Sequence, residues 1–232
     1  MSRLIVVTGA ARGIGAAIAA AFRAQGDSVL GVDRAAGEGT AALDLSRADA
    51  GDALLGALGD RPVDGLVNAA AVFHSAPVAA TGAADWDRLS AVNLRAPYLL
   101  ARALAPRLAE RRGGIVNISS INGRRNARDN LVYDSLKAAL DHMTRGLALD
   151  LPGVRVNGVA PGGTATPGLG EWLTHAQGAK GLTPEQEMQR LVADQEIATG
   201  DDIARIVLFL LSPAGRWING EVIVADNAAH LK

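Results

Sequence analysis

The chain has 232 residues, which is long enough for a substantial core and near the upper end for one domain. Its 49% hydrophobic and 20% charged residues are ordinary for a globular protein, and its net charge of −1 excludes a global basic field for nucleic acid or anionic membrane. Because it has no cysteine, disulfides, thiolate catalysis and cysteine-ligated metals are excluded.

Targeting and metal-binding signals are weak in this sequence. The apolar run at residues 4–7 is too short for the core of a signal peptide, and no apolar stretch approaches the length of a membrane span. We therefore expect a cytoplasmic protein. The four histidines lack a compact ligand spacing, so we expect no catalytic metal.

Strand-like apolar runs alternate with helical patterns along the chain. We expect strands at residues 3–8, 28–32, 41–43, 63–68, 114–119, 154–159 and 221–225. We expect helices at residues 13–25, 48–58, 85–111, 132–151 and 201–211, the third of them broken or bent near Pro97. This alternation predicts an α/β fold: a Rossmann-like, doubly wound parallel sheet of about seven strands, with helices on both faces, in a single domain over residues 1–232.

Two segments fall outside this rhythm. Residues 162–199 carry glycine and proline early and become helical at 184–193. Long irregular segments in compact domains are usually lids or binding loops, so we expect a substrate lid here. The polar insert at residues 122–131 holds Arg124, Arg125 and Arg128. These arginines are either solvated surface or partners for an anionic substrate.

A glycine-rich turn follows the first strand and leads at once into a helix. It contains Gly9, Gly13 and Gly15, together with Arg12 and Ile14. Glycines let the backbone reach a pyrophosphate, and the helix N-terminus faces that anion with free N–H groups. The turn therefore predicts a dinucleotide-binding loop.

Asp33 lies at the end of the second strand, 24 residues after Gly9. A carboxylate at this place accepts hydrogen bonds from both hydroxyls of an adenosine ribose and repels a 2′-phosphate, so it favours NAD over NADP. Arg12 and Arg34 leave an alternative open, because either could meet a 2′-phosphate or both could be surface residues.

These features resemble the classical short-chain dehydrogenase/reductase family. The pattern Thr8-Gly9-x-x-x-Gly13-Ile14-Gly15 is similar to the family's cofactor motif, and the resemblance continues in order along nearly the whole chain. It departs from the family's glycines at Ala71 and at Asn227-Ala228. The further cofactor-binding residues that the resemblance implies are Asp44, Leu45, Asn68, Ala70, Pro161, Gly162, Thr164 and Thr166.

The family's active-site residues match Asn93, Ser120, Tyr133 and Lys137. The last two form the family's Tyr-x-x-x-Lys pattern, and Ser120 lies 13 residues before the tyrosine. Residues four apart share one face of a helix. Because a nearby ammonium favours the phenolate, we expect Lys137 to lower the pKa of Tyr133 below its ordinary value of about 10.

The resemblance implies a role for each of these residues. Tyr133 would be the acid/base for hydride transfer, and Ser120 would bind the substrate oxygen. Lys137 would also hold the nicotinamide ribose, and Asn93 would anchor a water that relays protons. This predicts an NAD-dependent oxidoreductase acting on a secondary alcohol or ketone. The alternatives are an NADP-dependent reductase of 3-oxoacyl-type ketones and a dinucleotide-binding sensor without catalysis.

The substrate stays open among cyclic alcohols or dihydrodiols, acyl thioester ketones, and sugar- or steroid-like ketones. Residues 164–172 resemble the loop of dihydro-dihydroxybenzoate dehydrogenases, which together with the arginines suggests a cyclic and anionic substrate. Trp172 and His175 lie in the longer segment at residues 162–199 and could touch the substrate.

Family members commonly form tetramers or dimers through two long helices, so we expect a homo-oligomer, a homotetramer or a dimer. Leu140, Met143 and Leu147 recur at helical spacing and would serve such an interface or face the sheet.

Overall fold

The computed structural model describes residues 2–175 and 182–231. Within these residues one sheet is formed by the strands β1 (Leu4–Thr8), β2 (Ser28–Asp33), β3 (Thr40–Ala42), β4 (Gly65–Asn68), β5 (Gly114–Ile118), β6 (Arg155–Pro161) and β7 (Val222–Ala225). The order across the sheet is β3-β2-β1-β4-β5-β6-β7, and every neighbouring pair is parallel. The predicted fold class, a doubly wound parallel sheet of about seven strands, is confirmed.

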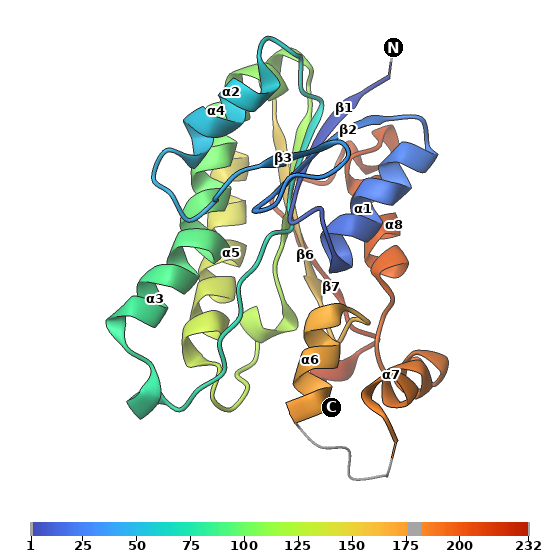
Figure 1. Cartoon of the computed structure of the whole chain (residues 1–232). Helices are drawn as coiled ribbons and strands as arrows, with labels where there is room; N and C mark the ends of the chain where they lie inside the picture. Colours follow the sequence, from blue (N-terminus) through green and yellow to red (C-terminus); the bar gives the residue numbers. More distant parts are fainter. Residues whose placement is uncertain (1, 176–181, 232) are drawn as a thin grey trace.

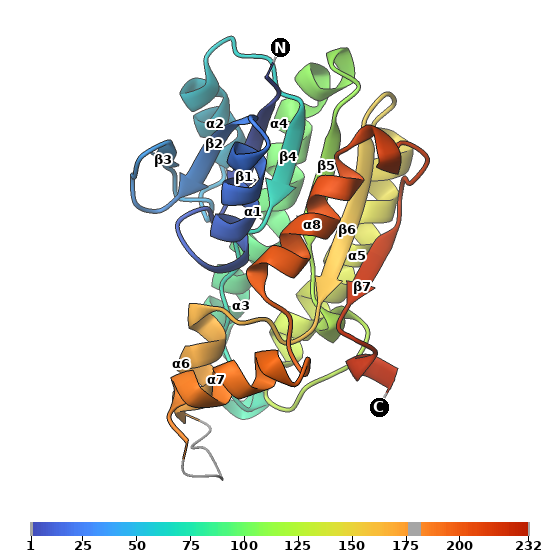
Figure 2. The same cartoon turned by 90° about the vertical axis from the view of Figure 1, so that its right-hand side faces the viewer.

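Helices cover both faces of the sheet (Figure 1, and Figure 2 after a quarter turn). One face carries α1 (Gly13–Ala24) and α8 (Gly200–Leu210), and the other carries α2 (Ala50–Leu58), α4 (Ala96–Glu110) and α5 (Leu131–Asp150). Ile5 and Val7 of β1 belong to the apolar core under α1 and α8, whereas Val6 belongs to the core on the opposite face. Strands buried on both faces explain the continuous apolar runs in the sequence.

The long helix expected at residues 85–111 is interrupted next to Pro97. It consists of α3 (Ala83–Ser90), a π-helical turn (Ala91–Arg95) and α4. Proline has no N–H to donate, and its ring crowds the carbonyl four residues earlier, which here belongs to Asn93. The wider π turn accommodates the proline. It also leaves the Asn93 side chain buried, at 1% exposure.

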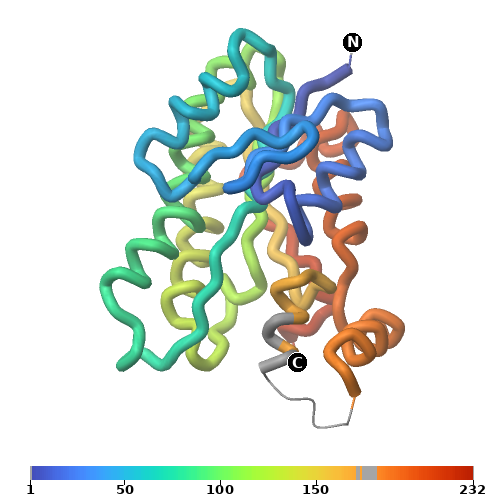
Figure 3. Tube along the Cα trace, viewed as in Figure 1, coloured from blue at the N-terminus to red at the C-terminus, as the bar shows by residue number. Residues whose placement is uncertain are grey.

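The described part of the segment at residues 162–199 forms two helices, α6 (Pro167–His175) and α7 (Pro184–Ala193), of which the sequence predicted only the second. Pro167 suits the first position of a helix, and the Thr166 hydroxyl accepts a hydrogen bond from the Leu169 N–H at 3.3 Å. A bridge between Thr164 and Ala198 joins the two ends of the segment. Figure 3 shows α6 and α7 beyond the carboxyl ends of the strands.

The remaining elements are short. They are the 3₁₀ turns Val78–Ala80, Ile121–Gly123, Pro213–Gly215 and Ala229–Leu231.

Leu140 and Leu147 are buried and Met143 packs against the same core as Leu147, so of the two alternatives these residues face the sheet. In the described part of the chain, no helix has the length and apolarity needed to cross a membrane.

Candidate functional site

The turn between β1 and α1 leaves no room for a side chain at Gly9 or at Gly15. Gly9 has a φ of +67°, and a Cβ there would lie 2.8 Å from the Ala70 Cα, while a Cβ on Gly15 would lie 2.2 Å from the Gly9 carbonyl oxygen. Only glycine fits both positions. The Thr8 hydroxyl accepts hydrogen bonds from the N–H groups of Ala69 (3.0 Å) and Ala70 (3.1 Å), which fixes the loop after β4 against the loop after β1.

The surroundings of this turn fit a dinucleotide. In the described part of the chain, the residue before α1, Arg12, gives its first turn no side-chain cap, and N–H groups at the start of a helix are suited to bind an anion. The Asp33 carboxylate accepts hydrogen bonds from the N–H groups of Ala11 (3.1 Å) and Arg34 (2.8 Å), and it therefore lies against the glycine loop. A Cβ on Gly13 would lie 3.5 Å from the Thr166 methyl group, so the loop after β6 meets the glycine loop here.

The residues after β3 have different surroundings. Asp44 is exposed, and its carboxylate accepts hydrogen bonds from the hydroxyl (2.7 Å) and the N–H (2.9 Å) of Ser46, which lower the pKa of Asp44. Leu45 is buried in the core beneath α2 and α4. Of this pair, only Asp44 has its side chain open to a ligand.

Asn68 and the loop after β6 each form hydrogen bonds with other residues of the protein. The buried Asn68 amide donates to the Asn117 side-chain oxygen at 2.8 Å, while its own Oδ1 has no hydrogen-bond partner among the described residues. β6 ends at Pro161, and the Gly162 N–H then donates to the Ala225 carbonyl at 3.0 Å. The buried Thr164 donates its hydroxyl to the Gly162 carbonyl at 3.2 Å.

Ser120, Tyr133 and Lys137 come together at the carboxyl end of β5. Ser120 caps the turn that follows β5, where its hydroxyl accepts from the Asn122 N–H at 3.1 Å, and it is hydrogen-bonded to Tyr133. Lys137 donates from Nζ to the Ile118 carbonyl at 2.9 Å. The same Nζ lies 5.5 Å from the centre of the Tyr133 ring.

Burial dominates the pKa of both titratable groups. It raises the pKa of Tyr133 to about 12, against the opposing effect of the Ser120 hydrogen bond, and it lowers the pKa of Lys137 to about 8, against the opposing charge of Asp141. The expectation that Lys137 brings the pKa of Tyr133 below its ordinary value is wrong for the protein by itself. The cost of ionising a buried phenol exceeds the stabilisation that its neighbours give the phenolate.

Asn93 connects the π turn to the loop after β4. Its side-chain amide donates to the carbonyls of Val72 (2.9 Å) and Leu89 (3.0 Å). The residue after Val72, Phe73, sets its ring edge-on to Tyr133, with the centroids 5.0 Å apart and the planes at 75°. Sequence reasoning missed Phe73. The available signal was an aromatic residue just after a strand-end motif in a chain with only 3% aromatic residues.

Asp134 is a second residue that sequence reasoning missed. It follows Tyr133 and is 2% exposed. Its carboxylate accepts hydrogen bonds from the Asn122 amide (2.8 Å) and from the Ala127 N–H (2.7 Å). The insert at residues 122–131 is therefore anchored to the first turn of α5.

The three arginines of the insert differ. All three side chains are exposed, and only for Arg124 is a partner found among the described residues: its guanidinium donates to the Val222 carbonyl of β7 at 2.8 Å. A structural role therefore accounts for Arg124 alone.

The side chains of Trp172 and His175 lie outside the described part of the structure. Across residues 2–175 and 182–231, no group of three or more histidine or carboxylate side chains is arranged to hold a metal ion.

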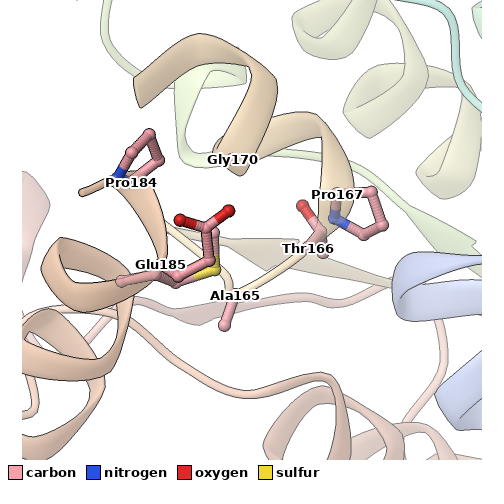
Figure 4. Close-up of a pocket in the computed structure, with 7 residues that line it drawn as sticks. Ala165, Thr166, Pro167, Gly170, Pro184 and Glu185 are labelled. Carbon is pink, nitrogen blue, oxygen red and sulfur yellow. The ribbon is translucent and has the colours of Figure 1, made fainter. Parts of the chain in front are cut away.

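A cavity of about 430 Å³ separates α6 from α7. In Figure 4, Glu185 and Pro184 of α7 lie on one side of it, and Thr166 and Pro167 lie on the other. Because Thr166 also contacts the glycine loop, this cavity adjoins the candidate cofactor site.

Comparison with known proteins supplies the family. The family described as enoyl-(acyl carrier protein) reductase matches residues 9–230. The chain belongs to the short-chain dehydrogenase/reductase family. It is 30% identical over 246 residues to dehydrogenase/reductase SDR family member 6 of Danio rerio, covering 99% of this chain and 98% of the relative. It is 32% identical over 248 residues to 2-(S)-hydroxypropyl-CoM dehydrogenase 3 of Xanthobacter autotrophicus, covering 97% and 95%.

Solved structures resemble this short-chain dehydrogenase/reductase along its whole length. A protein described as an NAD(P) dependent gluconate 5-dehydrogenase from Beutenbergia cavernae, with bound NADP, has a TM-score of 0.87 and 27% identity, covering 99% of this chain and 97% of that one. The 3-ketoacyl-(acyl-carrier-protein) reductase from Brucella melitensis, complexed with NADH, has a TM-score of 0.83 and 26% identity, covering 98% of both. The protein is thus an oxidoreductase of a family whose members bind NAD or NADP.

Proposed function

We propose that this short-chain dehydrogenase/reductase transfers hydride between NAD(H) and a secondary alcohol or its ketone, with Tyr133 as the acid/base. The observation that carries the proposal is the grouping of Ser120, Tyr133 and Lys137 at the carboxyl end of β5. A substrate oxygen beside Ser120 and Tyr133 would meet two hydroxyl groups, and Lys137 is buried next to them, at 2% exposure.

The chain's own residues donate and accept the proton that accompanies hydride transfer. When bound, the nicotinamide supplies or accepts the hydride. With a pKa of about 12, Tyr133 holds its proton at neutral pH, which suits donation to a ketone oxygen. In alcohol oxidation the phenolate has to form, and the Ser120 hydrogen bond favours it. A charged Lys137 would act in the same direction. Ser120 also stabilises charge that develops on the substrate oxygen.

We infer a preference for NAD from Asp33. A carboxylate at the end of β2 accepts hydrogen bonds from ribose hydroxyls and repels a 2′-phosphate. Lys137 is proposed to hold the nicotinamide ribose, and the glycine loop is proposed to hold the pyrophosphate. The exposed Arg125 and Arg128 support an anionic substrate as the finer proposal, and the resemblance at residues 164–172 supports a cyclic one.

Thermal shift with NADH and NADPH tests the cofactor assignment on the wild type, Asp33→Asn and Asp33→Ala. A ligand that binds only the folded state raises Tm in proportion to ln(1 + [L]/Kd). We expect NADH to stabilise the wild type more than NADPH does. Asp33→Asn keeps an oxygen for the Ala11 N–H but loses the charge, so we expect it to relax the preference while Asp33→Ala also weakens binding. A stronger shift with NADPH would favour the alternative, an NADP-dependent ketone reductase.

Absorbance of NADH then tests the chemistry against a panel of secondary alcohols and ketones. Tyr133→Phe keeps the ring and removes the acid/base, so we expect kcat to fall by a factor of about 100 or more, with the cofactor thermal shift retained. Cofactor binding with no turnover of any alcohol or ketone would instead favour a dinucleotide-binding sensor.

Light scattering, which gives the molar mass in solution, tests the proposed homo-oligomer.

A further inference from the structure

We propose that Phe73 contacts the substrate and determines specificity, as a fixed aromatic wall beside Tyr133 that favours secondary alcohols and ketones with a flat or cyclic apolar group on the reacting carbon. This inference rests on the proposed function, because it takes Tyr133 as the centre of the reaction. It adds a residue that the family motifs do not contain.

The first observation is the exposure of the ring. Phe73 packs edge-on against Tyr133 and yet is 49% exposed. A single exposed apolar side chain is ordinary on a protein surface. This one differs because the rest of its ring is in contact with the phenol that would exchange the proton. A substrate bound at the Tyr133 hydroxyl would lie near this ring, and we take the open part of Phe73 to face it.

The second observation is that the backbone around Phe73 is fixed on both sides. On one side, the buried Asn93 amide holds the Val72 carbonyl at 2.9 Å. On the other, the Ala76 N–H donates to the Asp129 carbonyl at 2.8 Å. A half-exposed ring on a free loop would move away from the site, whereas this ring is held at both ends of its segment.

The third observation concerns what holds Asp129 itself. Its insert is anchored to the buried Asp134 carboxylate through Asn122 and the Ala127 N–H, at 2.8 and 2.7 Å. Asp134 directly follows Tyr133 on α5. The helix that carries the phenol thus also anchors the loop that supports Phe73, so the distance between the two rings is set by one connected set of contacts.

A wall of this kind selects substrates by shape. An apolar ring on the reacting carbon stacks on, or meets edge-on, the open part of Phe73 and displaces water from it, which a small acyclic group does only in part. A polyhydroxylated sugar chain would lose hydrogen bonds to water against the same surface. Cyclic and aryl substrates are therefore favoured over sugar-like ones.

The test compares Phe73→Ala and Phe73→Leu with wild type on 2-butanol, cyclohexanol and 1-phenylethanol. We expect Phe73→Ala to lower kcat/KM for 1-phenylethanol by a factor of about 10 to 100, mostly through a higher KM, and to change 2-butanol by less than about threefold. For 1-phenylethanol, the kcat/KM of Phe73→Leu should fall between those of the wild type and of Phe73→Ala. Phe209→Ala, which removes a similarly exposed ring from α8 at 42% exposure, is the matched control and should leave all three substrates unchanged.

Two results would overturn the inference, and they are distinguishable. If Phe73→Ala lowers kcat equally for all three alcohols, the ring only shields Tyr133, and the proposed function stands without this wall. If the wild type oxidises no alcohol and reduces no ketone with either cofactor, the proposed function fails first. A readout without turnover separates the cases: acetophenone should raise the Tm of the NADH-saturated wild type more than that of NADH-saturated Phe73→Ala.

Discussion

The Nζ of Lys137 lies 5.5 Å from the centre of the Tyr133 ring, but it donates its hydrogen bond to the carbonyl of Ile118. Burial moves the two pKa values in opposite directions, to about 8 for Lys137 and about 12 for Tyr133. Between these values both side chains are neutral in the protein by itself. A charged Lys137 therefore assists the phenol only below about pH 8, unless a bound ligand raises the pKa of Lys137.

Lys137 should make stability depend on pH in a characteristic way. Its pKa is lowered from 10.5 to about 8 on folding, so between these values the unfolded chain binds more protons, and stability rises with pH through this window. The shift corresponds to about 3 kcal/mol as an upper figure. In Lys137→Met the rise should be absent and the free energy of unfolding at pH 7 should be higher. Urea unfolding at pH 7.5 and 9.5 measures both, and equal pH dependence in the two proteins would contradict the burial of a charge at this position.

Ser120 should lower the pKa of Tyr133, because its hydrogen bond stabilises the phenolate. The chain has only two tyrosines, so Tyr98→Phe leaves Tyr133 as the only phenol for titration by ultraviolet difference absorbance. In this background we expect Ser120→Ala to raise the pKa of Tyr133 further, and Ser120→Thr, which keeps a hydroxyl, to restore it. An unchanged titration in Ser120→Ala would mean that the serine does not contact the phenolate.

The sequence predicted most of the fold because the features that determine it are local. Strands buried on both faces read as continuous apolar runs, and the bend near Pro97 follows from the missing N–H of proline. The turn around Gly9 could be predicted because glycine readily adopts the φ of +67° that the turn requires. The helix α6 was missed because Gly168 and Gly170 lower the helical propensity of a segment that Pro167 and the Thr166 hydroxyl start.

Contacts between distant segments account for what the sequence did not predict. Phe73 meets Tyr133 across sixty residues of chain, and Arg124 reaches the Val222 carbonyl across ninety-eight. The raised pKa of Tyr133 depends on burial, which no spacing rule reports. Asn227 and Ala228 replace glycines of the family pattern and still adopt the left-handed φ values of +48° and +62° that glycine would allow.

Two alanine substitutions, at Gly15 and at Gly146, test how tightly the backbone packs in the glycine loop. A methyl group on Gly15 would meet the Gly9 carbonyl oxygen at 2.2 Å, so Gly15→Ala must displace the loop backbone. We expect it to abolish the thermal shift with NADH and to destabilise the protein by about 1–3 kcal/mol. A methyl group on Gly146, inside α5, would meet no neighbouring atom within 4 Å, so Gly146→Ala should instead stabilise the fold by about 0.5–1 kcal/mol. Similar behaviour of the two variants would show that the crowding at Gly15 is relieved without cost.

Asp134 should stabilise the insert at residues 122–131 more than it stabilises the rest of the fold. It is buried and accepts two hydrogen bonds, from the Asn122 amide and from the Ala127 N–H. We expect Asp134→Ala to lower the free energy of unfolding by about 2–3 kcal/mol, because it leaves these donors without a partner. Asp134→Asn keeps an oxygen for the Ala127 N–H and, with the Asn122 amide turned over, a donor for its oxygen, so it should recover at least half of the loss. Urea unfolding measures the stability, and hydrogen exchange at the Ala127 amide reports the insert itself. If that amide exchanges at the same rate in Asp134→Ala and in the wild type, Asp134 does not anchor the insert, and the support for Phe73 has to come from Asn93 alone.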